Sequence, residues 1–141
     1  MSGINPAFQD GPVTFNVAAA VDGGQLVIPD GTDNTLVNVA GAAATNVIGV
    51  ALSPAAPAGT DSATDVAARP VEVAVALHGV FRVTYAANAS FGARLKAAAS
   101  GQVTPMTLGT DAEDLCVGTC LEPGGVTSGN KGKTAIRAMG C

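Results

Sequence analysis

The sequence predicts an all-β fold, either a small β-barrel or a β-sandwich, and three observations support that prediction. Short apolar runs rich in Val, Leu and Ile alternate with turn-forming residues at roughly 8–12 residue intervals, which is typical of sandwiches and barrels. One stretch, residues 71–85, alternates large apolar side chains with polar or small ones at the period of a strand. No stretch shows the apolar stripe of an amphipathic helix, because Gly and β-branched residues interrupt the Ala runs.

The first third of the chain predicts four short strands. Between them lie Asp22-Gly23-Gly24, Pro29-Asp30-Gly31 and Gly41, and such residues supply the backbone conformations that tight turns need. The strands are expected at residues 13–20, 25–28, 36–39 and 47–52.

The clearest strand signal covers residues 71–85. Odd-numbered positions from Val71 to Tyr85 are apolar with the exception of Gly79, while the even positions between them are mostly small, polar or charged. A single strand of that length in one register would be unusual. Gly79 therefore predicts a bend or bulge that divides the run into two strands.

The remainder of the chain predicts a hairpin and two further strands. The hairpin turns at Ser100-Gly101, and the last two strands are separated by a Gly-rich loop at residues 122–132. The strands are expected at residues 93–97, 102–108, 115–121 and 133–139.

Two segments lack strand periodicity. Residues 1–12 contain two Pro and two Gly and are expected to form an extended N-terminal arm, with residues 13–141 forming a single β-domain. In a free arm Ile4 and Phe8 would be exposed, so they anchor either on a partner or on their own domain. Residues 54–70 form a long loop of Pro, Ala, Gly, Ser, Thr and Asp, and loops of this length are usually functional or disordered.

The composition limits the class of protein. The chain is 48% apolar but 4% aromatic and has no Trp, so its core must use small aliphatic residues, and association with other chains is expected to add stability. A net charge of −4 with 13% charged residues argues against nucleic-acid binding. No apolar run approaches the roughly 18 residues of a membrane span, and signal-peptide features are absent, so we expect synthesis in a cytoplasm and no membrane partner.

The three cysteines indicate neither a disulfide framework nor a metal site. Cys116 and Cys120 fall on one face of a strand-like run, ~13 Å apart at strand rise, which is too far to share a metal ion. We expect both to be small buried apolar residues, and Cys141 to be exposed and unpaired.

Residues that could carry catalysis are few, so we predict that the chain is not an enzyme. His78 is the single histidine, and Glu72 shares its face of the strand but lies six residues away, too far to orient it as a base. The segment Asp30-Gly31-Thr32-Asp33-Asn34 lacks the pattern of a calcium loop and is interpreted as an Asx turn. No metal site and no cofactor are predicted.

A Gly-Lys-Thr sequence at residues 132–134 superficially resembles the end of a phosphate-binding loop. The first Gly of that motif is replaced by Thr127, and no helix is expected to follow. We interpret the segment as a hairpin loop whose Lys131 and Lys133 could meet an acidic partner surface.

Two segments of the chain resemble each other. Residues 47–54 (VIGVALSP) and residues 116–123 (CVGTCLEP) share Gly, Leu and Pro at corresponding positions. Two structurally equivalent strand–loop–strand units in one barrel would explain the similarity. Chance likeness between two apolar strands that end at a proline is the alternative.

Six motifs, most of them a strand with a Gly, follow one another along the chain: N-P-A-F at 5–8, V-I-G-V-A at 47–51, V-x-V-x-V…G-V-F at 71–81, F-G-A-R-L at 91–95, G-Q-V-T at 101–104 and V-G-T-C-L-E-P at 117–123. Their order and spacing, over residues 5–139, resemble the small capsid cement, or head decoration, proteins of tailed phages. The resemblance implies a β-barrel or β-tulip-like body that is commonly trimeric. The Ala-rich residues 39–46 and the long loop at 54–70 depart from that pattern.

The resemblance also implies a function and a partner. It predicts a structural virion protein that binds the capsid exterior as a homotrimer and clamps neighbouring subunits of the major capsid protein. An alternative is a β-sandwich carbohydrate-binding or adhesion module displayed on a particle surface, although Tyr85 is the only tyrosine available for sugar stacking. The residues expected to contact the capsid are Ile4, Pro6 and Phe8 in the arm, and those expected to contact the capsid or a neighbouring subunit are Pro57, Asp61, Asp65 and Arg69 in the loop.

Overall fold

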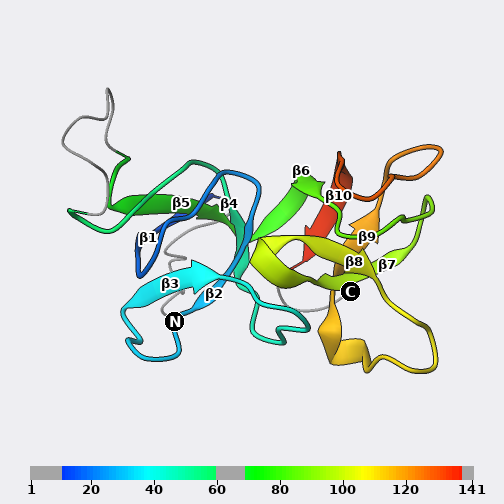
Figure 1. Ribbon diagram of the computed structural model, residues 1–141, viewed down its shortest axis with the longest axis horizontal. Helices are drawn as coiled ribbons and strands as arrows, with labels where there is room; N and C mark the ends of the chain where they lie inside the picture. The colour runs from blue at the N-terminus through cyan, green and yellow to red at the C-terminus, as the bar shows by residue number, and fades with distance from the viewer. Residues whose placement is uncertain (1–10, 60–68, 138–141) are drawn as a thin grey trace, which may run out of the picture.

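The structure is a computed structural model that describes residues 11–59 and 69–137. In this part of the chain it contains ten strands and two short 3-10 turns, which confirms the all-β prediction. The strands form two sheets that lie side by side along the long axis of the molecule (Figure 1). Each strand expected from the sequence is present, with ends that differ by a few residues.

The first sheet is a closed five-stranded barrel. It consists of β1 (Val13–Val17), β2 (Leu26–Pro29), β3 (Leu36–Val39), β4 (Gly49–Ala51) and β5 (Glu72–Ala76). The strand order is β1-β3-β2-β4-β5, and the ring closes because β1 pairs with β3 in parallel and with β5 antiparallel. A core cluster made mostly of valine side chains comes from these strands and from the segments that connect them.

The second sheet consists of β6 (His78–Thr84), β7 (Arg94–Ala97), β8 (Val103–Pro105), β9 (Cys116–Cys120) and β10 (Lys131–Arg137). Neighbouring strands are antiparallel in the order β6-β10-β9-β7-β8. The two edge strands meet just after β6, where Tyr85 bridges Val103 in parallel and the amide of Ala86 donates to Val103 O (2.8 Å). The 3-10 turns η1 (Ala99–Gly101) and η2 (Glu113–Leu115) precede β8 and β9.

The second sheet repeats the first, strand for strand. If β6 corresponds to β1, β7 to β2 and so on to β10 and β5, each strand has the same two neighbours in both sheets, provided that the bridge between the ends of β6 and β8 is included. In both sheets the parallel pairing joins the first strand to the third. Backbone hydrogen bonds recur as well: Gly24 N donates to Ala51 O (2.7 Å), and Gly92 N donates to Cys120 O (2.8 Å). We call β1–β5 the first repeat and β6–β10 the second repeat.

The two similar segments of the sequence fall on β4 and β9, which are corresponding strands. Gly49 and Gly118 each lie under a carbonyl oxygen of the next strand, and a Cβ at either position would overlap the oxygen of Ala76 or Ala135. Glycine is required there because the two backbones approach so closely. The segments are therefore equivalent units, but they lie in separate sheets and not in one barrel as predicted.

The long apolar run of the sequence forms two strands, β5 and β6, separated by Leu77 alone. Gly79 has φ 140°, and a Cβ there would lie 2.9 Å from Cζ of Phe81. The run is divided, as predicted, but at Leu77 and not at Gly79, which lies inside β6 and pairs with Ile136. Leu77 carries the chain directly from the first repeat into the second.

A second core cluster joins the two repeats. It combines Leu26 and Val50 of the first repeat with Tyr85, Leu95 and Ile136 of the second, and all five side chains are buried. Since these residues pack against one another, the repeats are connected by a common core as well as by the chain.

Candidate functional site

The structure describes two of the contact residues predicted from the sequence, Pro57 and Arg69. Pro57 lies two residues after Ala55, whose amide donates to Val21 O (2.9 Å) and whose carbonyl accepts the amide of Val21 (2.8 Å). Arg69 Nη1 lies 3.9 Å from Asp22 Oδ1. The structure therefore places both ends of the long loop against the segment between β1 and β2. The other predicted contacts, Ile4, Pro6, Phe8, Asp61 and Asp65, lie outside the described residues.

A groove of about 240 Å³ lies where β5 passes into β6. The first described residues of the chain line this groove, beside side chains that are largely apolar. Leu52 and Leu77 remain 45% and 37% exposed. Exposed apolar surface of this kind suits contact with another apolar segment. The lining residues are Gly11, Pro12, Leu52, Ala76, Leu77, His78 and Phe81.

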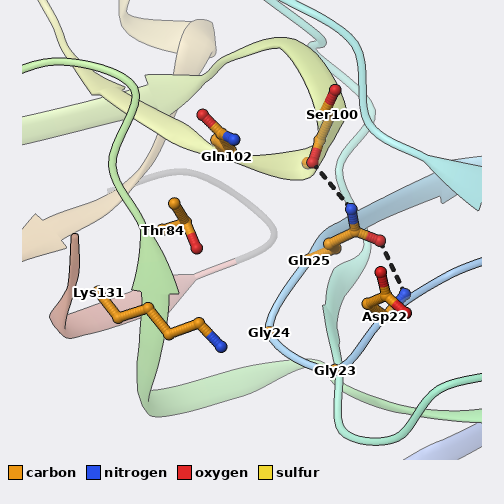
Figure 2. Close-up of a pocket in the computed structure, with 9 residues that line it drawn as sticks. Asp22, Gly23, Gly24, Gln25, Thr84, Ser100, Gln102 and Lys131 are labelled. Carbon is orange, nitrogen blue, oxygen red and sulfur yellow. Dashed lines mark hydrogen bonds between the residues drawn. The ribbon is translucent and has the colours of Figure 1, made fainter. Parts of the chain in front are cut away.

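A polar pocket of about 250 Å³ lies between the two repeats (Figure 2). Gln25, before β2, donates from Nε2 to the carbonyl of Ser100 (3.1 Å), and its Oε1 accepts the amide of Asp22 (2.8 Å). Gln25 thus fastens the turn before β2 onto η1 of the second repeat. Figure 2 shows the side chains of Thr84, Gln102 and Lys131 around the same hollow. The remaining lining residues are Gly23, Gly24 and Gly101.

The sequence pattern places His78 and Glu72 on the same face of one strand. In the structure these two residues belong to different sheets. Glu72 pairs with Asn16 in the first repeat, whereas His78 pairs with Arg137 in the second. In the described residues, no group of three or more His, Cys, Asp and Glu side chains is placed to hold a metal ion. No helix in that part of the chain is long and apolar enough to cross a membrane.

The acidic turn between β2 and β3 is an Asx turn, as predicted. Asp30 Oδ2 accepts the amides of Asp33 (2.9 Å) and Thr32 (3.3 Å), and the bond from Asp33 holds the pKa of Asp30 below its ordinary value. Asp33 Oδ1 accepts the hydroxyl (2.6 Å) and the amide (2.9 Å) of Thr35, and these bonds likewise lower the pKa of Asp33. The carboxylates therefore serve the turn itself.

The two cysteines of β9 differ from each other. Cys120 is a free, fully buried thiol, as predicted. Cys116 is buried, as predicted, but it is disulfide-bonded, which was not predicted. The strand spacing that excluded a shared metal site gave no information about a disulfide to a more distant residue.

Some features of these sites arise only between residues that are distant in the chain, and the sequence did not predict them. The bond from Gln25 to Ser100 spans 75 positions, so no local pattern could indicate it. Lys131 and Lys133 were predicted to lie in a hairpin loop, whereas the structure places both on strand β10 with their side chains exposed.

No protein-family model matches the sequence, and no curated protein matches it. The structure is similar to the crystal structure of the head fiber gp8.5 N base of bacteriophage phi29, with a TM-score of 0.63 and 14% sequence identity. The two chains share a fold. The match covers 92% of this chain and 96% of that chain, so it includes both repeats and not the barrel alone.

Proposed function

We propose that this chain is a structural protein of a phage virion that binds the exterior of the capsid and stabilises contacts between major capsid subunits. The observation that carries the proposal is the fold shared with the phi29 head fiber N base over 92% of this chain. The order of motifs along the sequence, which resembles head decoration proteins, supports the same assignment. We further propose that the protein acts as a homotrimer, without a catalytic site and without a nucleic-acid or membrane partner.

The proposed mechanism is mechanical. A protein that binds across a seam between subunits binds only the assembled shell, so mass action stabilises that state, by about 2.7 kcal/mol per site at a hundredfold excess over Kd. Several contacts from one trimer add through effective concentration. In this account Ile4, Pro6 and Phe8 of the arm contact a neighbouring subunit, and Pro57, Asp61, Asp65 and Arg69 form a second contact.

The test is co-sedimentation of the purified protein with phage shells that lack it, together with the solution mass of the free protein. Saturable binding with a fixed stoichiometry is the expected result, and a full-length chain that does not sediment with shells contradicts the proposal. Deleting residues 2–12 is expected to weaken binding about tenfold or more while leaving the melting temperature within a few degrees. Unchanged binding by that variant removes the arm from the mechanism.

The second candidate function is a carbohydrate-binding module on a particle surface. The polar pocket between the repeats offers the hydroxyl of Thr84 and the amide of Gln102 as hydrogen-bonding groups. Tyr85, however, is fully buried and provides no stacking surface for a sugar. Glycan binding that is saturable and lost in Gln102→Ala, with no binding to shells, would favour this function over the first.

A further inference from the structure

Charge is distributed unevenly between the two repeats. Residues 1–77 contain one arginine and seven acidic residues, a net charge of −6, whereas residues 78–141 contain six Lys and Arg and four acidic residues, a net charge of +2. The chain as a whole has a net charge of −4, so this basic character is hidden in the overall composition.

Four of the cations lie on one face of the second sheet. In the pairing of β6 with β10, Arg82 is opposite Lys133. Lys131, two residues before Lys133, and Arg137, four residues after it, lie on the same face of β10. All four side chains are exposed, whereas Val83, which alternates with them, is buried on the opposite face. Side chains at alternate positions of a strand share a face, so these four cations lie on the same face of the sheet. We call it the basic face: Arg82, Lys131, Lys133 and Arg137.

A hollow of about 240 Å³ lies within the basic face. It is lined by Arg137 together with the small residues Gly118, Thr119 and Ala135 of β9 and β10. Val80, which pairs with Ala135, is 58% exposed beside it. The surface therefore combines a small, partly apolar centre with a rim of positive charge, an arrangement suited to a protein partner.

The cations of the basic face are not neutralised within the described part of the chain. Lys96, on β7, is paired with Asp111 (2.8 Å), but none of the four cations lies within 4 Å of a described carboxylate. Glu122, at the edge of this face, accepts the backbone amide of Lys133 (3.0 Å) and not its ammonium. Like charges at directly opposite positions, such as Arg82 and Lys133, destabilise a sheet, so the fold gains nothing from this arrangement.

The first repeat shows that the fold does not need these cations. By strand register, Thr14 and Ala74 of β1 and β5 correspond to Arg82 and Lys133, and Glu72 corresponds to Lys131. The same strand pair is thus built without a single cation in the first repeat, and Thr14 and Glu72 are exposed there, as their counterparts are in the second. The positive charge is a property of the second repeat alone.

We infer that the basic face docks onto an acidic protein surface, which, if the proposed function holds, is an acidic patch of the major capsid protein. Charge complementarity is the argument for this partner. A nucleic acid fits less well, because residues 1–77, with a net charge of −6, would be repelled by phosphates.

The test compares two variants with the same net charge. Arg82→Gln/Lys133→Gln removes two charges from the basic face, and Thr14→Glu/Ala74→Glu adds two negative charges at the corresponding positions of the first repeat, so both chains have a net charge of −6. We expect the first variant to bind shells about tenfold or more weakly at about 50 mM salt, with a smaller difference at about 300 mM, and the control to bind within about threefold of the wild type. Equal binding by wild type and Arg82→Gln/Lys133→Gln overturns the inference and leaves the proposed function intact.

A second measurement separates failure of the inference from failure of the proposed function. On a poly-L-glutamate column, wild type and control are expected to elute at higher salt than Arg82→Gln/Lys133→Gln, whether or not shells are bound. Elution of all three at the same salt overturns the inference. If a DNA duplex retains the wild type more tightly than poly-L-glutamate does, the inference is overturned in favour of a nucleic-acid partner. If the wild type self-associates in a salt-dependent way and Arg82→Gln/Lys133→Gln does not, the inference is overturned in favour of a second copy of this chain as the partner.

Discussion

A single buried polar pair distinguishes the core of the second repeat from that of the first. Tyr85 and Thr134 are fully buried with their hydroxyl oxygens 2.6 Å apart, and Thr134 Oγ1 also donates to Gly132 O (3.2 Å). Burial raises the pKa of Tyr85 well above its ordinary value, so the hydroxyl stays protonated. By strand register the corresponding residues of the first repeat are Val17 and Val75, so the fold itself accepts an apolar pair here.

We expect the two single substitutions of this pair to differ in cost. Thr134→Val leaves the Tyr85 hydroxyl buried without its main partner and should cost about 1–3 kcal/mol, whereas Tyr85→Phe leaves Thr134 bonded to Gly132 and should cost about 1 kcal/mol. The double variant removes both hydroxyls and should be less destabilised than the sum of the single variants. Urea unfolding of the four proteins provides the measurement, and strict additivity would contradict this account.

A charged pair on the second sheet predicts a specific pH dependence. Asp111 accepts from Lys96 Nζ (2.8 Å) and from the amide of Thr107 (2.7 Å), and the bond from Lys96 is the largest cause that holds the pKa of Asp111 below 3.8. A carboxyl with a depressed pKa in the folded state adds stability that is complete above its ordinary pKa and is lost as the pH falls through the folded value.

We therefore expect Asp111→Asn to melt below the wild type at pH 7, and the gap to narrow as the pH falls below about 4. Lys96→Met should reproduce part of the loss at pH 7, because Lys96 supplies the largest stabilising contact of the carboxylate. Thermal melts at neutral and acidic pH check the prediction. A gap that stays constant across this range would show that Asp111 acts through shape and not through its charge.

At the scale of the elements, the two glycines of β4 and β9 provide the sharpest test of the repeat. Gly49→Ala and Gly118→Ala each place a methyl group against a carbonyl oxygen of the next strand and should cost about 1–3 kcal/mol or more. Gly31→Ala is the matched control, because nothing lies within 4 Å of a Cβ there, and it should stay within about 0.5 kcal/mol. Chemical unfolding measures all three, and a Gly49 variant as stable as the Gly31 variant would contradict the close strand approach.

The strands could be predicted from the sequence because their signals are local. Apolar alternation located β5 and β6, and Gly79 indicated a division that the structure places two residues earlier, at Leu77, since each signal lies within a few residues. The closure of the sheets could not be predicted. It depends on pairings such as Asn16 with Leu36 and Tyr85 with Val103, which join segments whose sequences do not specify each other.

The candidate surfaces could likewise be predicted only as far as local sequence signals reach. Lys131 and Lys133 attracted notice because they are neighbours in the sequence, but Arg82 joins them only through the register of β6 with β10. An apolar pattern indicates which face of a strand is buried, but it does not say which strand lies beside it. Residue types alone therefore suggested an acidic partner, and the register was needed to define a face.

At the scale of the whole molecule, the core shared by the two repeats implies a single cooperative unit. Leu26 belongs to the first repeat, yet it packs with Tyr85 and Leu95 of the second, whereas Val27 lies in the cluster that comes from the barrel strands and the segments that connect them. Separating the repeats would expose Leu26 and its neighbours to water. We therefore expect one unfolding transition, in which calorimetric and van't Hoff enthalpies agree.

The contrast between neighbouring residues on β2 tests this cooperativity directly. Leu26→Ala removes a side chain from the shared core and should cost about 2–5 kcal/mol, and Val27→Ala removes one from the barrel and should cost a smaller amount. In one cooperative unit, both variants lower amide hydrogen-exchange protection in β6–β10 as much as in β1–β5, because the most protected amides exchange through global unfolding. Loss of protection confined to the first repeat in Val27→Ala would show two separate units. Loss of protection in both repeats would mean that the two repeats unfold together. A mechanical force applied at the basic face of the second repeat would then be resisted by the whole molecule, as the proposed role in a capsid requires.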